Sequence, residues 1–96
     1  MPAVVWSAKA RNDIAEIWLW IAEHSGAATA DTIGARIERR AAALASHPHM
    51  GRLRPEIAEG ARSLVCERWL ELYIAEADLV KIARVLDGAR DLHNLD

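Results

Sequence analysis

The chain has 96 residues, of which 52% are hydrophobic and 27% charged, a size and composition typical of one globular domain. Its net charge of −2 lacks the basic excess with which proteins usually bind phosphates, so nucleic-acid contact would need a local basic cluster. We expect a cytoplasmic protein without a membrane span, because no apolar run is long enough to cross a bilayer, the N-terminus lacks a signal-peptide pattern, and Cys66 is the single cysteine.

The first half of the chain has helical periodicity. Residues 4–6 predict a short strand, and Ser7 is placed to cap a helix over residues 8–23, which Gly26 would end. Apolar residues spaced at i, i+3, i+4 and i+7 form one buried stripe on this helix. The stripe consists of Ile14, Ile17, Trp18 and Ile21.

Two large apolar side chains of the same helix, Leu19 and Trp20, lie more than about 100° from that stripe. They need a cover, which is either the next helix or a partner protein. That next helix is predicted over residues 27–46, and its alanines allow close packing. Its inward face carries Ala30, Ile33, Ile37, Ala41 and Leu44. Pro48 prevents continuation, and residues 47–55 are expected to form an exposed loop.

Strand alternation takes over in the second half. Strands are predicted over residues 62–66, 69–74 and 79–86, with a hairpin turn at residues 76–78. In the middle strand, Leu70, Leu72 and Ile74 should line one face, with Trp69, Glu71 and Tyr73 on the other. The last strand is strongly apolar, so we expect it in the centre of a sheet or covered on much of both faces. After it, residues 89–96 are predicted as a tail or partial helix.

The order of these elements predicts one α+β domain over residues 1–96. The arrangement is β-α-α-β-β-β(-α), an antiparallel sheet with a helical hairpin packed on one face. The other face, or a groove along it, would then be available for binding.

Several segments resemble the ParE/RelE toxin superfamily, and its ParE branch most closely. The first helix carries Ala10-x-x-Asp13-Ile14-x-x-Ile17-Trp18-x-x-Ile21-Ala22. The middle of the chain carries Pro48-x-x-Gly51-Arg52-x-Arg54-Pro55-Glu56 and Gly60-x-Arg62-Ser63-Leu64-Val65. The last strands carry Arg68-Trp69-Leu70-x-x-Tyr73 and Ile82-x-Arg84-Val85-Leu86-x-Gly88-Ala89-Arg90-Asp91-Leu92. The resemblance covers nearly the whole chain, in the order of the family.

The chain departs from the ParE pattern in three respects. Asp87 stands where histidine is common, and Trp69 where tyrosine is common. Glu67, Glu71 and Glu76 make the middle strands more acidic than in many relatives. The acidic residues weaken the case for direct contact with nucleic acid.

The resemblance implies a toxin of a type II toxin–antitoxin pair, held inactive by a ParD-like antitoxin from the same operon. ParE-type members are described as poisons of DNA gyrase, whereas RelE-type members cut messenger RNA on the ribosome. Since the two share a fold, the residues of the site must decide between them. A third interpretation is a toxin that has lost its activity and acts only as an antitoxin-binding module. DNA would reach the complex only indirectly, through the antitoxin.

RNA cleavage without a metal requires groups that transfer protons as well as cations. The resemblance aligns Arg62, Arg68 and Arg90 with basic residues of the RelE cleft, but the C-terminal stretch offers only His93, Asn94 and Asp96 for proton transfer. His93 is the best candidate, since histidine titrates near neutral pH. An arginine clamp without an obvious proton relay favours the non-catalytic branch.

These considerations assign the residues to sets. No catalytic residue is assigned to a gyrase poison; a ribonuclease would use Arg62, Arg68, Arg90 and His93. The predicted target contacts are Arg84, Arg90, Asp91 and His93. The predicted antitoxin contacts are Leu19, Trp20, Arg52, Arg54, Arg62 and Arg68. No cofactor is implied. No metal site is predicted, because His47 and His49 lack further ligands at suitable spacing.

Overall fold

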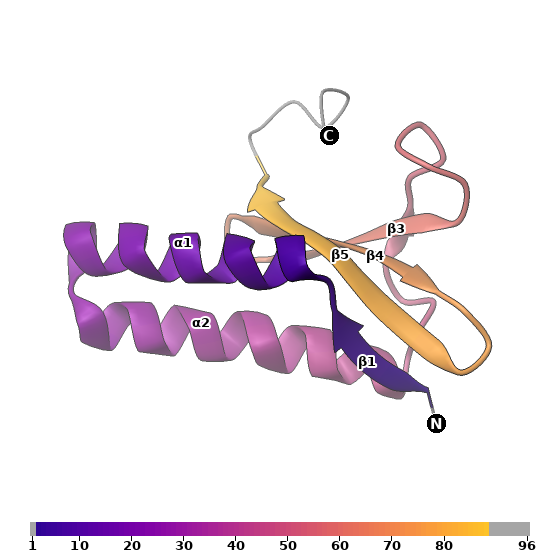
Figure 1. The fold of residues 1–96 in the computed structure, drawn as a ribbon, viewed down its shortest axis with the longest axis horizontal. Coiled ribbons are helices and arrows are strands. Elements are labelled where there is room, and N and C mark those ends of the chain that lie inside the picture. The colour runs from indigo at the N-terminus through magenta and orange to yellow at the C-terminus, as the bar shows by residue number, and fades with distance from the viewer. Residues whose placement is uncertain (1, 89–96) are drawn as a thin grey trace.

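A computed structural model describes residues 2–88 of the chain (Figure 1). Two helices, a short 3-10 turn and five strands follow one another along it. The elements are β1 (Ala3–Trp6), α1 (Ala8–Ser25), α2 (Ala27–Ala42), η1 (Ala43–Ala45), β2 (Arg52–Leu53), β3 (Ala61–Cys66), β4 (Trp69–Ala75) and β5 (Leu79–Asp87). The predicted α+β class is confirmed, and the elements predicted within residues 2–88 follow in the predicted order, with β2 as an additional strand.

The five strands form one sheet in the order β1-β5-β4-β3-β2. The apolar strand β5 lies inside this sheet, between β1 and β4, as its composition predicts. The sheet is mixed rather than wholly antiparallel, because β1 runs parallel to β5 and the other neighbours are antiparallel. Side chains alternate with period two in both parallel and antiparallel strands, so the sequence pattern does not show in which direction β1 runs relative to β5.

A second difference is β2, which lies within the predicted loop. It pairs antiparallel with β3 through Arg52↔Ser63 and Leu53↔Arg62. Two paired residues are too few for strand alternation to be recognised.

The start and end of α1 follow the predicted signals. The Ser7 hydroxyl accepts a hydrogen bond from the Ala10 N–H at 3.0 Å, which caps the first turn. Gly26 has a φ of 91°, a conformation that favours glycine, and the chain turns there into α2. The two helices lie side by side as a hairpin on one face of the sheet (Figure 1). Neither helix in residues 2–88 is long and apolar enough to cross a bilayer.

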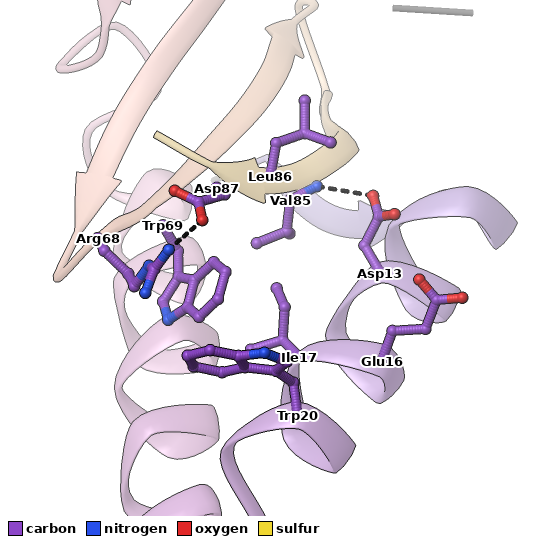
Figure 2. A pocket seen from close by; sticks show the side chains of 9 residues that line it. All are labelled: Asp13, Glu16, Ile17, Trp20, Arg68, Trp69, Val85, Leu86 and Asp87. Carbon is purple, nitrogen blue, oxygen red and sulfur yellow. Dashed lines mark hydrogen bonds and ion pairs between the residues drawn. The ribbon is translucent and has the colours of Figure 1, made fainter. Parts of the chain in front are cut away.

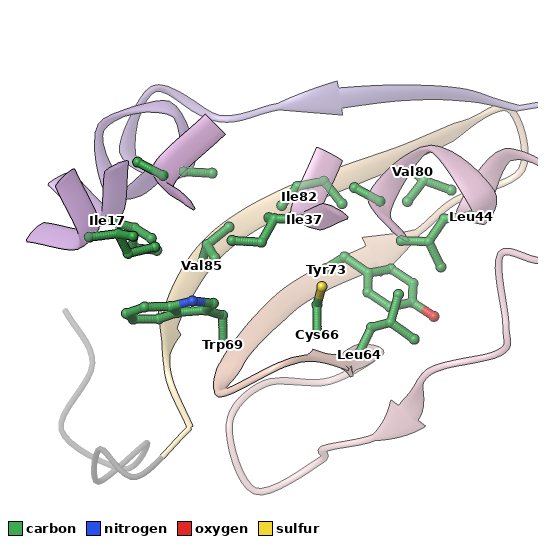
Figure 3. Packing of buried hydrophobic residues seen from close by; sticks show 14 residues of the cluster. Ile17, Ile37, Leu44, Leu64, Cys66, Trp69, Tyr73, Val80, Ile82 and Val85 are labelled. Atoms are coloured by element: carbon green, nitrogen blue, oxygen red, sulfur yellow. The ribbon is translucent and has the colours of Figure 1, made fainter. Parts of the chain in front are cut away.

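The main core lies between the helical hairpin and the sheet (Figure 3). From α2 and η1 it receives Ala30, Ile37, Ala41 and Leu44, all completely buried and all on the predicted inward face. The strands contribute Leu64, Cys66, Trp69, Tyr73, Val80, Ile82 and Val85. The opposite face of the sheet carries a smaller cluster of Leu70, Leu72 and Leu86, with Ile57 packed against it. Leu70 and Leu72 therefore lie on the face predicted for them, opposite Trp69 and Tyr73, with a register shift between Leu72 and Tyr73.

The segment between η1 and β3 is tied to the sheet at Gly51. Its N–H donates to the Tyr73 hydroxyl at 2.8 Å. A Cβ atom at this position would lie 2.6 Å from that hydroxyl and 2.8 Å from the Ser63 carbonyl oxygen. Only glycine therefore lets the backbone approach the ring so closely.

Candidate functional site

An open pocket of about 340 Å³ lies between α1, the β3–β4 turn and the end of β5 (Figure 2). Its lining combines indole rings with charged side chains. The lining residues are Asp13, Glu16, Ile17, Trp20, Arg68, Trp69, Val85, Leu86 and Asp87. Trp20 and Arg68 had been assigned to antitoxin contact from the sequence, and the structure brings these two residues together.

Two tryptophans and an arginine form the centre of this pocket. The Arg68 guanidinium carbon lies 5.2 Å from the Trp20 ring centroid and 5.1 Å from that of Trp69. Both distances are within the range of cation–π attraction. Arg68 also forms an ion pair with Asp87 (Figure 2). His24 stacks on Trp20 with ring centroids 4.4 Å apart.

Trp20 and Leu19 remain exposed, by 44% and 55%. The second helix therefore does not cover them, which removes one of the two alternatives that the sequence left open. A further groove, lined in part by Ile21, Thr29 and Ile33, continues from Trp20 along the end of the helical hairpin. Together these residues form a surface of mixed apolar and charged side chains that α2 leaves exposed.

The turn that presents Arg68 contains an unusual backbone conformation. Glu67 has a φ of 58°, a left-handed value that costs a non-glycine residue on the order of 1–2 kcal/mol. Its carboxylate pairs with Arg36 of α2 at 2.6 Å. Because both partners of this pair are well exposed to water, the pair compensates little of that cost.

The floor of the pocket is fixed by Asp13. Its carboxylate accepts two hydrogen bonds from the Arg84 guanidinium, at 2.8 and 3.0 Å, and one from the Val85 N–H at 2.9 Å. The hydrogen bond and charge of Asp13 raise the pKa of Arg84 above its usual value, although burial opposes this. Arg84, a predicted target contact, is thus held in a bidentate ion pair that joins α1 to β5.

The other predicted antitoxin contacts lie at the far end of β3. Arg62 donates to the carbonyl oxygens of His49 and Gly51, at 3.0 and 2.9 Å. Arg54 donates to the Ser63 hydroxyl at 3.2 Å and to Glu56 at 2.9 Å. Both side chains therefore hold the segment that precedes β3.

The predicted antitoxin contacts divide into two groups. Leu19, Trp20 and Arg68 share one end of the molecule. Arg52, Arg54 and Arg62 lie at the beginning of β3, roughly 20 Å away by the rise of a strand of this length. The structure does not bring the two groups into one site.

Sequence reasoning gave no role to Glu71, which is completely buried. It lies on the helix-facing side of β4, between Leu64 of β3 and Val85 of β5 in the register of the sheet. Neither carboxyl oxygen has a hydrogen-bond partner among the described residues. Loss of hydration raises its pKa from 4.5 to about 8, although the charge of Arg40 opposes this. In the sequence, Glu71 alternates with Trp69 and Tyr73. This position on an otherwise aromatic face of the strand was the signal that could have indicated its burial.

Arg90, Asp91 and His93, predicted as target contacts, lie outside the described residues, as does the predicted tail or partial helix over residues 89–96. Gly88 is the last residue described, and its N–H donates to the Arg68 carbonyl oxygen at 2.8 Å. The chain therefore leaves the described fold beside Arg68, next to the pocket.

The comparison with protein families decides the assignment. The family model for the ParE toxin of the type II toxin–antitoxin system parDE matches residues 4–92. The chain belongs to this ParE family. It is 28% identical to Toxin ParE3 of Caulobacter vibrioides over 92 residues, which cover 96% of this chain and 92% of that relative. The function that follows is that of a ParE-type toxin of a type II toxin–antitoxin system.

A solved structure shares the ParE fold. It is a chain of the chromosomal ParDE toxin–antitoxin system from P. aeruginosa, with a TM-score of 0.80 and 21% sequence identity. The match covers 91% of this chain and 96% of the other. In this ParE-family chain, several of the resembling residues have structural roles, because Asp13 binds Arg84 and Gly51 packs on Tyr73.

Proposed function

We propose that this ParE-family toxin arrests growth by poisoning DNA gyrase in the cytoplasm and that a ParD-like antitoxin neutralises it. The observation that carries the proposal is the exposed surface of Leu19, Trp20 and Arg68 beside the end of β5. The chain continues from this point into Arg90, Asp91 and His93. A partner on this surface would therefore lie beside Gly88, the last described residue, which the proposed target contacts follow in the sequence.

The chemistry of this surface suits an antitoxin segment that folds on binding. Such a segment needs apolar anchors and charge partners to offset the cost of becoming ordered. The exposed parts of Trp20 and Leu19 supply apolar area, and aromatic residues with arginine are enriched among the residues that dominate binding energy. Arg68 supplies a cation already aligned by two rings.

The placement of the arginines favours gyrase poisoning over RNA cleavage. A ribonuclease centre requires Arg62 and Arg68 to act on one phosphate group. They lie at opposite ends of β3, and the Arg62 guanidinium binds backbone carbonyls. Glu71, an acid whose pKa of about 8 would suit proton transfer, is completely buried. A poison that stabilises the covalent DNA–gyrase intermediate needs a rigid surface and no nucleophile of its own.

A gyrase assay tests the target. The purified toxin should inhibit supercoiling and trap cleaved DNA, and Arg90→Ala should weaken both effects without changing the melting temperature. An inactive chain at large molar excess would refute gyrase as the target. Cleavage of messenger RNA of the RelE type, lost on His93→Ala, would then become the better-supported function. Binding of antitoxin without growth arrest would instead identify an inactive antitoxin-binding module.

A second assay tests the antitoxin surface. Trp20→Ala should weaken antitoxin binding by roughly tenfold or more while shifting thermal stability little, because the ring is exposed in the free toxin. Ile37→Ala is the contrasting variant, since its side chain is completely buried and its loss should lower stability by about 2–5 kcal/mol. A Trp20 variant with reduced stability and unchanged affinity would place its role in the fold.

A further inference from the structure

A second groove, distinct from the tryptophan pocket, lies where α2 and η1 meet the end of β3. Its volume is about 380 Å³. Arg36, Arg39, Arg40, Ala43 and Cys66 line it. The three arginines of α2 and Ala43 of η1 are spaced by three and four residues, so they follow one stripe of this helical segment. We call these residues the arginine groove.

The positive charge of the arginine groove is only partly compensated. Arg36 pairs with Glu67 at 2.6 Å. Arg40 donates from Nε to the Val65 carbonyl oxygen at 3.1 Å, which is an uncharged acceptor. Within residues 2–88, no carboxylate forms an ion pair with Arg39 or Arg40. Glu71, whose charge would act on Arg40, has a pKa of about 8 and is mostly uncharged at neutral pH.

Beside these arginines, part of the edge of β3 pairs with no other strand of residues 2–88. The short strand β2 pairs with β3 only at Arg62 and Ser63. Beyond them, the Val65 carbonyl points away from β4 and toward Arg40. In a strand, the N–H and C=O of one residue point to the same side, so the Val65 N–H faces the same edge. The Val65 side chain is 58% exposed. This edge is covered by a charged side chain rather than by another strand.

We propose that the arginine groove binds an extended acidic segment of a partner polypeptide, which adds to the edge of β3 at Val65 and places carboxylates on Arg39 and Arg40. Main-chain hydrogen bonds would supply affinity, as in other cases of strand addition, and the arginines would select an acidic sequence. Arg40 would release the Val65 carbonyl and turn to a carboxylate of the segment.

The partner is the antitoxin, so this inference rests on the proposed function. An acidic polypeptide is favoured over nucleic acid by the charge of the whole chain. With a net charge of −2, the chain lacks the basic excess on which binding to a phosphate backbone usually depends, whereas a short acidic segment needs only the local cations. The groove thus gives the antitoxin a second contact that is separate from Trp20.

Charge reversal at Arg39 tests the groove. Arg39→Glu should weaken binding of the antitoxin from the same operon by about tenfold at low salt, with the difference shrinking at 0.5 M salt as exposed charges are screened. Arg11→Glu on α1 is the matched control, because it makes the same change in net charge at another exposed helix position. Equal affinities of the two variants would overturn the proposal.

Hydrogen exchange tests strand addition directly. The Val65 amide of the wild-type toxin should become protected when the antitoxin binds, and Arg39→Glu should reduce that protection. An unchanged Val65 amide in a saturated complex would rule out the added strand. Failure of the wild-type chain to bind antitoxin at all would refute the proposed function instead. Salt-dependent binding of a DNA or RNA oligonucleotide that is lost in Arg39→Glu, but not in Arg11→Glu, would assign the groove to nucleic acid and overturn the proposal.

Discussion

Replacing Glu71 by glutamine should make the toxin markedly more stable at alkaline pH and leave it nearly unchanged at acidic pH. The carboxyl group is completely buried without a hydrogen-bond partner among the described residues, so the fold favours its protonated form. Glutamine has nearly the shape of protonated glutamate and cannot ionise. The two proteins should therefore differ only where Glu71 is forced to lose its proton.

The sign follows from the direction of the pKa shift. The pKa rises from 4.5 to about 8 in the folded protein. Below pH 4.5 the group is protonated in both the folded and the unfolded chain, and its contribution to stability is fully present. Between these pH values the unfolded chain releases the proton while the folded chain keeps it, so stability falls as pH rises. Above about pH 8 the loss is complete.

The size of the loss follows from the same pKa values. A pKa raised from 4.5 to about 8 corresponds to about 5 kcal/mol of unfolding free energy over the full pH range. Since a domain of this kind is stable by only about 5–15 kcal/mol, a loss of that size would be easy to detect. Rotation of Arg40 toward the ionised carboxylate would reduce this loss of stability, because the charge of Arg40 lowers the pKa of Glu71.

Denaturation with urea at a series of pH values from 5 to 9 measures the effect, with unfolding free energies of wild type and Glu71→Gln compared at each pH. Glu59→Gln, at an exposed position, serves as the control for loss of a carboxylate. Other titrating groups cancel in the comparison because all three proteins share them. Parallel pH profiles for wild type and Glu71→Gln would show that Glu71 is ionised in the fold and would refute the reasoning.

Three further outcomes are expected. Gly51→Ala should destabilise the fold by about 1–3 kcal/mol in urea denaturation, because the added Cβ atom would collide with the Tyr73 hydroxyl and the Ser63 backbone. An unchanged urea midpoint would show that the segment around Gly51 can move away from the sheet. Asp13→Ala should lower the free energy of unfolding by about 3–5 kcal/mol in urea denaturation, since Asp13 no longer accepts hydrogen bonds from Arg84 and the Val85 N–H. A decrease below about 1 kcal/mol would contradict this structural role of Asp13. Cys66 should react slowly with a disulfide reagent at pH 7–8 in the native protein and rapidly in urea, because burial raises the pKa of its thiol. Rapid reaction of the native protein would contradict this burial.

Much of the fold was predictable because its signals are local. The Ser7 cap, the Gly26 turn and the inward stripe of α2 follow from residue spacing and appear as expected. The parallel pairing of β1 with β5 is a contact between residues far apart in the sequence. It leaves no local pattern, so it was missed.

The candidate site was harder to predict, because a residue type does not reveal its partner. Trp20 was identified by its position off the apolar stripe, and its exposure agrees with a partner surface. Arg54 and Arg62 were grouped with Arg68 only by charge, yet each binds groups near its own end of β3. Glu71 was treated as part of an acidic bias, because sequence alternation gives the face of a residue but not its degree of burial.

The strand order also bears on when the toxin can fold during its synthesis. Among the strands of residues 2–88, β1 pairs only with β5, which is the last of them in the sequence and joins β1 to the rest of the sheet. Contacts between the two ends of a chain form late and slowly. A fragment that ends before β5 would therefore lack the strand that joins β1 to β4, and β1 would have no partner among the described strands.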